Sequence, residues 1–204
     1  MFVQMFTGSV TDAAAVRAAL ESWPDGVGLG AVGWLGSTAG ITPDGLLVAL
    51  ARFTSQETAR ANSERPEQGQ WWESLAANLA GEASFFESAD VDEDKLGDLD
   101  TAGFVQVMRG RVSDPAAARE LLRVDPGVWA ALRPDILGSL LISRDDGDYV
   151  MAVYFTSEAQ ARDAEKQDPP AELVAQREKL SALQVGEVTY FDLPDPWLSS
   201  PSQP

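Results

Sequence analysis

Apolar runs that suit strands alternate along this chain with segments that suit helices. Residues 2–6 form a short apolar-rich run that is typical of a strand. Thr11 and Asp12 are common N-cap residues, and they open an Ala-rich stretch that reaches about Trp23. The first part of the chain is therefore predicted to be a strand followed directly by a helix.

A β-hairpin and a second helix are predicted next. Two β-rich runs, residues 34–38 and 46–53, flank a turn at 43–45 that contains Asp-Gly. Asp-Gly between two such runs is a good hairpin signal. Thr54 and Glu57 have the spacing of a capping box, which indicates where the second helix begins.

The second helix is expected to be interrupted before the last strand. Pro66 disfavours the helical conformation at Arg65, so the helix should break there and restart toward the two tryptophans that follow. A strand over residues 83–86 then completes the order β-α-β-β-α-β.

The same pattern occurs twice. Sliding the chain by 102 residues places FVQMFTGSVTDAAAVRAAL, from Phe2, on FVQVMRGRVSDPAAARELL, from Phe104. After an insertion in the second copy the offset becomes 105, and LAANLAGEASFF, from Leu75, lies on LSALQVGEVTYF, from Leu180. A match that keeps its register through helices, turns and strands indicates a tandem duplication.

The second copy repeats the signals of the first. Ser113 and Asp114 precede Pro115, which is an N-cap followed by proline in the first turn of a helix. Its strands are expected at residues 104–108, 136–142, 149–155 and 188–191.

The two copies set the expected boundaries, with a first repeat at 1–87 and a second at 102–192. Residues 88–101 hold six acids and one lysine, which favours a solvated connector kept extended by self-repulsion. A metal loop is disfavoured because no glycine stands where a calcium loop needs its sharp turn. The Pro- and Ser-rich tail, 193–204, is expected to fray after Trp197.

Each copy should fold into an antiparallel sheet with both helices on one face and the other face uncovered. Two copies in one chain can cover each other. We therefore predict an α+β fold of two ferredoxin-like repeats whose sheets pack into an intramolecular barrel. The chain would then be a monomer with an internal pseudo-dimer, and a higher oligomer stays open.

The charge of the chain excludes several kinds of partner. Its 204 residues carry 15 Lys and Arg against 32 Asp and Glu, for a net charge of −17. Such a chain repels nucleic-acid phosphates and anionic lipid surfaces. No apolar run approaches the roughly 18 residues of a membrane span, and the first residues lack the basic region of a signal peptide. We expect a cytoplasmic protein without nucleic-acid or membrane partners.

The chain has no histidine and no cysteine. It therefore cannot form Ser-His-Asp or Cys-His triads, histidine-based metal or haem sites, disulfides or iron–sulfur clusters. A Mg²⁺ or Ca²⁺ site made of carboxylates alone stays open, but no Walker motif, dinucleotide-binding motif or EF-hand loop is present. We expect no cofactor and no metal, so any chemistry must use the remaining polar side chains or the reactivity of the substrate.

The β-α-β-β-α-β topology, the FVQ of the first strand, the hairpin Asp-Gly and the segment ARANSERPEQGQWW together carry a resemblance. Over nearly all of residues 1–192 the chain resembles tandem repeats of the dimeric α+β barrel superfamily, in particular its antibiotic biosynthesis monooxygenase (ABM) branch. This resemblance implies a small-molecule pocket. Some members oxidise aromatic polyketides with dioxygen and without metal or flavin, and others degrade haem with an axial histidine that this chain lacks.

The resemblance also points to particular residues. The cofactor-free oxygenases pair an asparagine with a tryptophan near the second helix, and Asn62 with Trp71 or Trp72 is the similar grouping here. The broken helix that displays these three residues and Arg65 could wall a pocket, by stacking on an aromatic substrate and hydrogen-bonding its carbonyl. Alternatively, the tryptophans only pack the helix on the sheet.

The second copy lacks this motif, because Ala164 stands where the first copy has Asn62 and no tryptophan follows. A site lined by the second helix would therefore exist in the first copy alone. Trp23, Trp34 and Trp129 lack comparable context and are expected in the core or at its rim.

Four more residues could contact a substrate. Gln4 and Gln106 are equivalent, and they could orient a ligand oxygen inside the barrel or hydrogen-bond across the pseudo-dyad. Arg52, at the end of its strand, could hold a phenolate or enolate, or simply pair with a surface carboxylate. Tyr154 is its counterpart in the second copy.

Two function classes follow. The first is a cofactor-independent monooxygenase-like protein acting on a small aromatic or polyketide-type molecule, with Asn62, Arg52 and Trp72 as catalytic residues. Gln4, Gln106, Arg65, Trp71 and Tyr154 would then bind the substrate. The second is a non-catalytic binding or structural member of the same superfamily.

Overall fold

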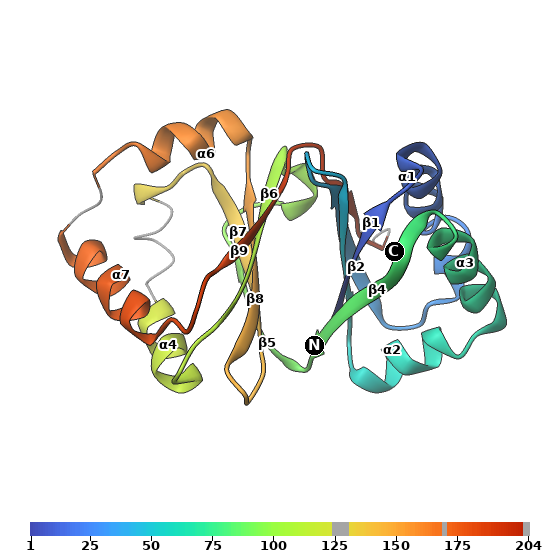
Figure 1. Cartoon of the computed structure of the whole chain (residues 1–204), viewed down its shortest axis with the longest axis horizontal. Coiled ribbons are helices and arrows are strands. Elements are labelled where there is room, and N and C mark those ends of the chain that lie inside the picture. Colours follow the sequence, from blue (N-terminus) through green and yellow to red (C-terminus); the bar gives the residue numbers. More distant parts are fainter. Residues whose placement is uncertain (124–130, 169–170, 202–204) are drawn as a thin grey trace. The chain divides into compact units, whose positions relative to one another are not determined.

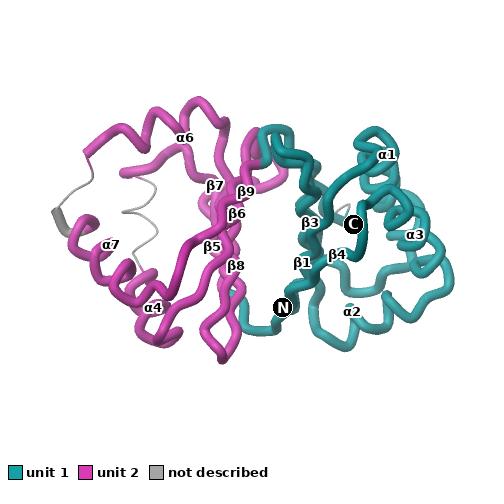
Figure 2. Tube along the Cα trace, viewed as in Figure 1, with its two compact units in different colours: residues 1–91, 193–204 teal, residues 92–192 magenta. Residues whose placement is uncertain are grey.

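The computed structural model of the chain describes residues 1–123, 131–168 and 171–201. The chain divides into two compact units, which Figure 2 shows in different colours. Unit 1 comprises residues 1–91 together with 193–204, and unit 2 comprises residues 92–192. The C-terminal segment therefore belongs to the same unit as the N-terminus.

Unit 1 is a five-stranded sheet in the order β10-β2-β3-β1-β4, with helices on one face (Figure 1). Its elements are β1 (Phe2–Val10), α1 (Ala13–Ser22), η1 (Val27–Gly30), β2 (Trp34–Ile41), β3 (Leu46–Phe53), α2 (Gln56–Ser63), α3 (Pro66–Ala76), β4 (Leu79–Ser88) and β10 (Trp197–Ser199). β3 is central and pairs antiparallel with both β1 and β2.

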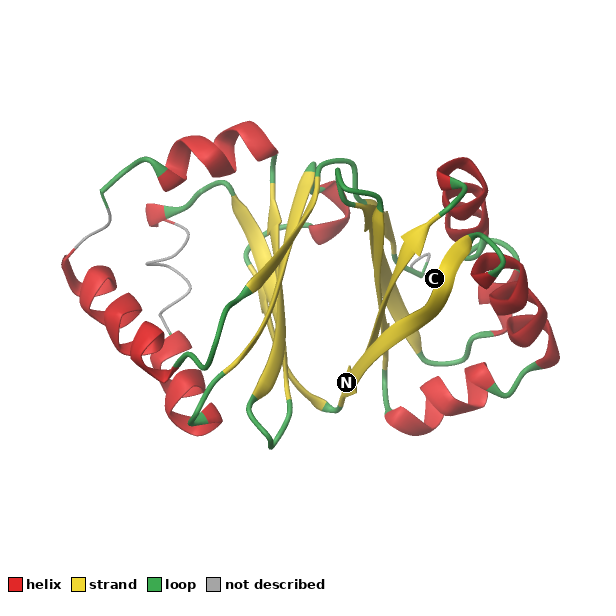
Figure 3. Cartoon of the chain, in the orientation of Figure 1, coloured by secondary structure: helices red, strands yellow, loops and turns green. Residues whose placement is uncertain are grey.

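Unit 2 repeats this arrangement in a sheet of order β5-β7-β8-β6-β9, again with helices on one face (Figure 3). Its elements are β5 (Asp90–Lys95), η2 (Leu99–Thr101), β6 (Phe104–Arg111), α4 (Pro115–Leu122), β7 (Ile136–Ser143), β8 (Asp148–Phe155), α6 (Glu158–Glu165), α7 (Ala171–Leu183) and β9 (Thr189–Leu193). The predicted α+β class and the ferredoxin-like order of elements are confirmed. The packing of the two sheets into an intramolecular barrel stays a prediction.

The first helix of each repeat, α1 and α4, begins at the predicted N-cap residue. The Asp12 carboxylate accepts a hydrogen bond from the Ala15 amide at 3.0 Å, and Asp114 does the same from Ala117 at 2.9 Å. Each carboxylate satisfies one of the amides that have no partner in the first turn. The N-terminal boundaries were therefore readable from local sequence.

The second helix of unit 1 begins one residue later than predicted. The capping box joins Ser55 and Thr58 rather than Thr54 and Glu57, since the Ser55 hydroxyl accepts from the Thr58 amide while the Thr58 hydroxyl accepts from the Ser55 amide. The break at Pro66 is confirmed: Arg65 is extended, with φ −71° and ψ 134°, and α3 starts at the proline.

Part of the acidic connector and part of the C-terminal tail form edge strands, which the sequence did not predict. Residues 90–95 form β5 at one edge of the unit 2 sheet, and Trp197–Ser199 form β10 at one edge of the unit 1 sheet. The physical reason is that β2 and β7 need hydrogen-bond partners, and a chain already extended by like charges or prolines can supply them.

These two edge strands are equivalent. The offset of 105 that aligns the ends of the repeats places Trp197 on Asp92 and Ser199 on Asp94. Gly36 of β2 leaves room for the Ser199 carbonyl oxygen, which a Cβ there would approach to 2.9 Å, and Gly138 of β7 leaves room for the Asp94 oxygen. Each sheet is thus completed by the segment that follows the last strand of the other repeat.

Among the residues that the structure describes, no helix is long and apolar enough to cross a membrane. Within the same residues, no group of three or more Asp and Glu side chains is placed to hold a metal ion.

Candidate ligand-binding site

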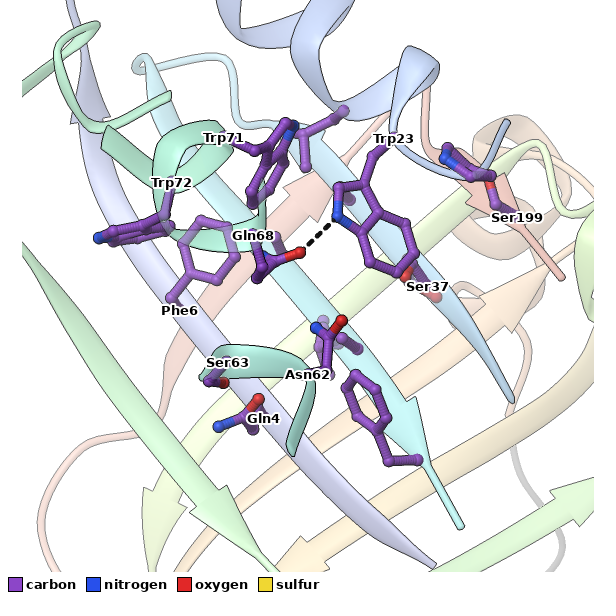
Figure 4. A pocket seen from close by; sticks show the side chains of 18 of the residues that line it. Gln4, Phe6, Trp23, Ser37, Asn62, Ser63, Gln68, Trp71, Trp72 and Ser199 are labelled. Atoms are coloured by element: carbon purple, nitrogen blue, oxygen red, sulfur yellow. Dashed lines mark hydrogen bonds between the residues drawn. The ribbon is translucent and has the colours of Figure 1, made fainter. Parts of the chain in front are cut away.

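Unit 1 holds a cavity of about 290 Å³ between its sheet and its helices (Figure 4). All five strands contribute side chains to the floor, which includes Gln4, Phe6, Ser37, Ala39, Ala49, Ala51, Phe53, Phe85, Trp197 and Ser199. Helices and connections form the roof, which includes Leu20, Trp23, Pro24, Asn62, Ser63, Gln68, Gly69, Trp71 and Trp72.

Small side chains in the middle of the sheet create this space. Ala39 of β2 lies opposite Ala49 of β3, and Ser37 lies opposite Ala51. Alternation along a strand turns these four side chains toward the same face, and none of them extends far above the backbone. The helices rest on larger residues around them, so a hollow is left over β2 and β3.

Aromatic rings form the walls of the cavity. Trp72 meets Phe6 edge to face, with centroids 5.1 Å apart, and lies 5.4 Å from Phe85. On the other side, Trp23 and Trp71 have centroids 6.3 Å apart. Rings placed at these distances and inclinations hold one another in position, and they offer flat apolar surface to a ligand.

Asn62 presents an amide N–H₂ group to the cavity. The residue is only 7% exposed, and its Oδ1 accepts a hydrogen bond of 2.9 Å from Arg65 Nη1. Arg65 Nη2 is in turn anchored on the Val27 carbonyl at 3.0 Å, and Gly30 leaves room for the guanidinium. Because Oδ1 is occupied, the free donor is Nδ2, which has no hydrogen-bond partner among the described residues.

Gln68 is held in the same way. Its Oε1 accepts from the Trp23 indole N–H at 2.8 Å, the dashed line in Figure 4, so its N–H₂ is left as a donor. Ser37 Oγ accepts from the Trp34 indole at 2.9 Å, which leaves the hydroxyl hydrogen. Both carboxamides and this hydroxyl are therefore oriented as donors by a fixed partner.

The Gln4 side chain offers the cavity a hydrogen-bond acceptor, in contrast to these donors. Its Nε2 donates to Glu87 Oε2 at 3.0 Å, so Oε1 is left to accept. No Asp, Glu, Lys or Arg is among the described residues that line the cavity. A neutral, largely apolar site of this kind strengthens each hydrogen bond inside it, and it supplies no charged acid or base of its own.

Five of the residues singled out from the sequence meet here. Gln4, Asn62, Trp71 and Trp72 line the cavity, and Arg65 holds Asn62. Trp71 also donates from its indole N–H to the Ala19 carbonyl at 3.1 Å, so it fastens α3 to α1 as well as lining the site. Lining a pocket and packing the helix were posed as alternative roles for the tryptophans, and Trp71 does both.

Arg52 does not line this cavity. It lies on β3 between Ala51 and Phe53, whose side chains do, so alternation turns it to the other face of the sheet. There it is 6% exposed and its guanidinium lies against Gly36. Arg52 is therefore not placed to contact a ligand in this cavity, and its role in holding a substrate stays a prediction.

Each glutamine of the equivalent pair hydrogen-bonds within its own unit. Gln4 bonds Glu87 of unit 1, and Gln106 bonds Asp192 of unit 2 at 2.8 Å. Gln4 also faces the helices, because it shares a face with Phe6 rather than with Val3 and Met5. Tyr154 of unit 2 is fully buried and lines no described cavity.

Unit 2 has a different cavity at the equivalent place. It measures about 530 Å³, and its floor carries Leu141, Met151 and Val153 where unit 1 has Ala39, Ala49 and Ala51. Gln106 lines it, together with Arg119, Arg123 and Arg133. The two units thus share an architecture but offer different chemistry to a ligand.

Several contributors to the cavity were missed from the sequence. Trp23 and Gln68 line the cavity and bond each other, and Trp197 enters it from the C-terminal strand. Trp34 is buried as expected, and Trp129 lies outside the described residues. The only sequence signal for Gln68 was its place between Pro66 and Trp71, one turn before the tryptophans.

No protein-family model matches the chain, and no curated protein sequence does. Solved structures match it over almost its whole length. A protein from Lactobacillus acidophilus named a "putative monooxygenase" has a TM-score of 0.72 at 10% identity, covering 98% of this chain and 95% of that one. One of the same name from Fusobacterium nucleatum has a TM-score of 0.76 at 10% identity, covering 98% and 94%. An anthrone oxidase-like protein has a TM-score of 0.69 at 12% identity, covering 99% and 94%. Each of these three structures therefore covers the length of both repeats in a single chain.

Proposed function

Because this chain has the ferredoxin-like α+β fold of the ABM-like dimeric α+β barrel proteins, in a single chain, we propose that it is a cofactor-independent monooxygenase-like protein acting on a planar aromatic or polyketide-type molecule. The observation that carries this proposal is the neutral, aromatic-walled cavity of unit 1, into which Asn62 and Gln68 present amide donors. Fold alone would not support it, since related folds carry unrelated functions.

The cavity selects its ligand by shape and hydrogen bonding. At about 290 Å³ it lies at the lower end of the range of small-molecule sites, which suits two or three fused rings. Trp72 and Trp71 provide flat surfaces for such rings, while Asn62 and Gln68 suit a carbonyl or phenolate oxygen.

In the proposed reaction the substrate supplies its own electrons. A hydroxylated anthrone loses a proton to solvent, and the anion is delocalised onto the oxygen that faces Asn62 and Gln68. The anion reduces dioxygen, a C–O bond forms, and water leaves as the carbonyl appears. One anthrone and one O₂ give one anthraquinone and one water. Donors aimed at the developing oxyanion lower the barrier to its formation.

The test is oxygen consumption with 1,8-dihydroxyanthrone, in the presence of EDTA. We expect one O₂ per anthraquinone formed, at a rate above that of the buffer. Asn62→Ala should lower kcat by about a hundredfold, since it removes a donor to the oxyanion. Asn78→Ala is the matched control, because Asn78 is a half-buried asparagine outside the cavity whose side chain donates to the Ser74 carbonyl. Unchanged turnover in Asn62→Ala would contradict the assignment.

A non-catalytic binding protein is the second candidate, and the absence of charged side chains from the described lining favours it. Such a protein would bind 1,8-dihydroxyanthraquinone, measured by calorimetry, and still leave the anthrone oxidising at the buffer rate. Binding and turnover together would exclude this alternative.

A further inference from the structure

The outermost strand of unit 1 contributes an end wall to the cavity. Trp197 pairs with Ala39 and Ser199 pairs with Ser37, so all four side chains lie on the face that carries the cavity. The floor runs from Trp197 on β10, across β2, β3 and β1, to Phe85 on β4. Trp197 and Phe85 therefore bound the cavity at opposite edges of the sheet.

Trp197 is held in place from several directions. The Arg17 guanidinium lies 5.4 Å from the centre of its ring, and Arg17 Nη1 pairs with Asp195 Oδ2 at 2.7 Å. Arg17 Nε also pairs with Glu21, at 2.8 Å on the same helix. At the start of the segment, Leu193 is fully buried and its Cβ would lie 3.2 Å from a Cβ at Gly40. A wall fixed at these points offers a ligand a rigid surface.

The equivalent strand of unit 2 has the same anchor and a different side chain. Asp92 stands at the position of Trp197 and lines the unit 2 cavity. Arg119, at the position of Arg17, pairs with Asp92 Oδ2 at 2.6 Å. The two repeats therefore keep an arginine that holds the edge strand, but they place a large ring in one cavity and a carboxylate in the other.

We propose that Trp197 is the specificity-determining residue of the unit 1 site, and that it limits the length of the fused-ring ligand. The proposal rests on the proposed function, because it assumes that a planar aromatic ligand occupies the cavity. An indole is large and stiff, so a ligand that extends along the floor toward β10 meets the ring and stops there. Replacing the indole by a methyl group opens this end and leaves Asn62, Gln68 and Trp72 in place.

Two probes that differ by one ring test this. 1,8-Dihydroxyanthraquinone has three fused rings, and 6,11-dihydroxy-5,12-naphthacenequinone has four. We expect the wild-type chain to bind the three-ring probe and to disfavour the four-ring probe in calorimetry. In Trp197→Ala the ratio of the two Kd values should shift by at least tenfold toward the larger probe. Trp197→Phe, which keeps a ring there, should shift it less.

Leu198→Ala is the matched control, since Leu198 is the next residue of β10, pairs with Thr38 and points away from the cavity face. It should leave the ratio unchanged. Melting temperatures of all variants show whether each chain is folded, and Trp197→Phe keeps the test open if Trp197→Ala does not fold.

The outcomes separate the two ideas. If the wild type binds the three-ring probe and neither Trp197 variant changes the ratio, Trp197 does not set ligand length, and the proposed function stands. If the wild type binds neither probe, the proposed function fails and the role of Trp197 fails with it.

Discussion

At Asn62, a short polar side chain becomes a directed donor only because another residue occupies its oxygen. Arg65 donates to Asn62 Oδ1 and, through its other terminal nitrogen, to the Val27 carbonyl. This bridge ties α2 to the segment that carries Val27 and fixes which way the carboxamide faces. Arg65 is therefore a positioning residue, which acts on a ligand through Asn62.

Arg65→Ala should weaken binding of 1,8-dihydroxyanthraquinone by about tenfold. Without Arg65, the Asn62 carboxamide can turn its oxygen toward the ligand. The lost bond from Arg65 to Asn62 Oδ1 has a charged donor, and such bonds contribute about 1.5–3 kcal/mol. Calorimetry measures the change. In an Asn62→Ala background the same substitution should have almost no further effect on affinity. Arg60→Ala is the control, since Arg60 is an exposed arginine on α2, the helix that carries Asn62, and pairs with Glu64. An equal loss in both backgrounds would show that Arg65 acts on folding instead.

At the scale of elements, the interruption at Pro66 divides one stretch of sequence into two helices, and both helices line the cavity. α2 delivers Asn62 near its end, and α3 delivers Trp71 and Trp72 from a new direction. A continuous helix would place these residues along a single axis. The start of α2 then matters for the site, because it sets where Asn62 lies along the helix.

Ser55→Ala should lower the free energy of unfolding by about 1 kcal/mol, because it removes the hydroxyl that accepts the Thr58 amide. Chemical denaturation gives the value. Glu57→Ala is the informative comparison, since the sequence suggested Glu57 for the capping box and the structure assigns that role to Thr58. A larger loss from Glu57→Ala than from Ser55→Ala would contradict the observed cap.

For the whole molecule, the main feature is that neither repeat completes its own sheet. β10, which follows the last strand of the second repeat, belongs to unit 1, and β5, which follows the last strand of the first, lies in the unit 2 sheet. Leu193, at the start of the returning segment, is fully buried. Covalent linkage of the two repeats therefore supplies strands that a single repeat lacks.

A chain of residues 1–95 alone should self-associate. It lacks β10, so the edge of β2 is left with unpaired backbone groups that another chain can bind. Size-exclusion chromatography with light scattering should show a dimer or larger species, next to a monomeric full-length chain. A folded chain of residues 1–95 that stays monomeric would contradict this expectation.

Local and periodic features were determined by the sequence. The repeat offset, the strand and helix order, the Asp12 and Asp114 caps and the break at Pro66 depend on neighbouring residues, so they could be predicted. Asn62, Trp71 and Trp72 were also found, because they are close in sequence and lie at the helix break.

Only the tertiary structure decided which distant side chains share the cavity. Trp23 meets Gln68, and Trp197 joins them from the other end of the chain, through strand pairing that no local pattern encodes. Alternation along β3 sets the face of Arg52, but only the packing of the helices decided that the cavity lies on the opposite face. The edge of a sheet can pair with any extended segment that reaches it. Connectivity and packing therefore decided that residues 90–95 and 197–199 became the edge strands β5 and β10, and the composition of these segments did not indicate it.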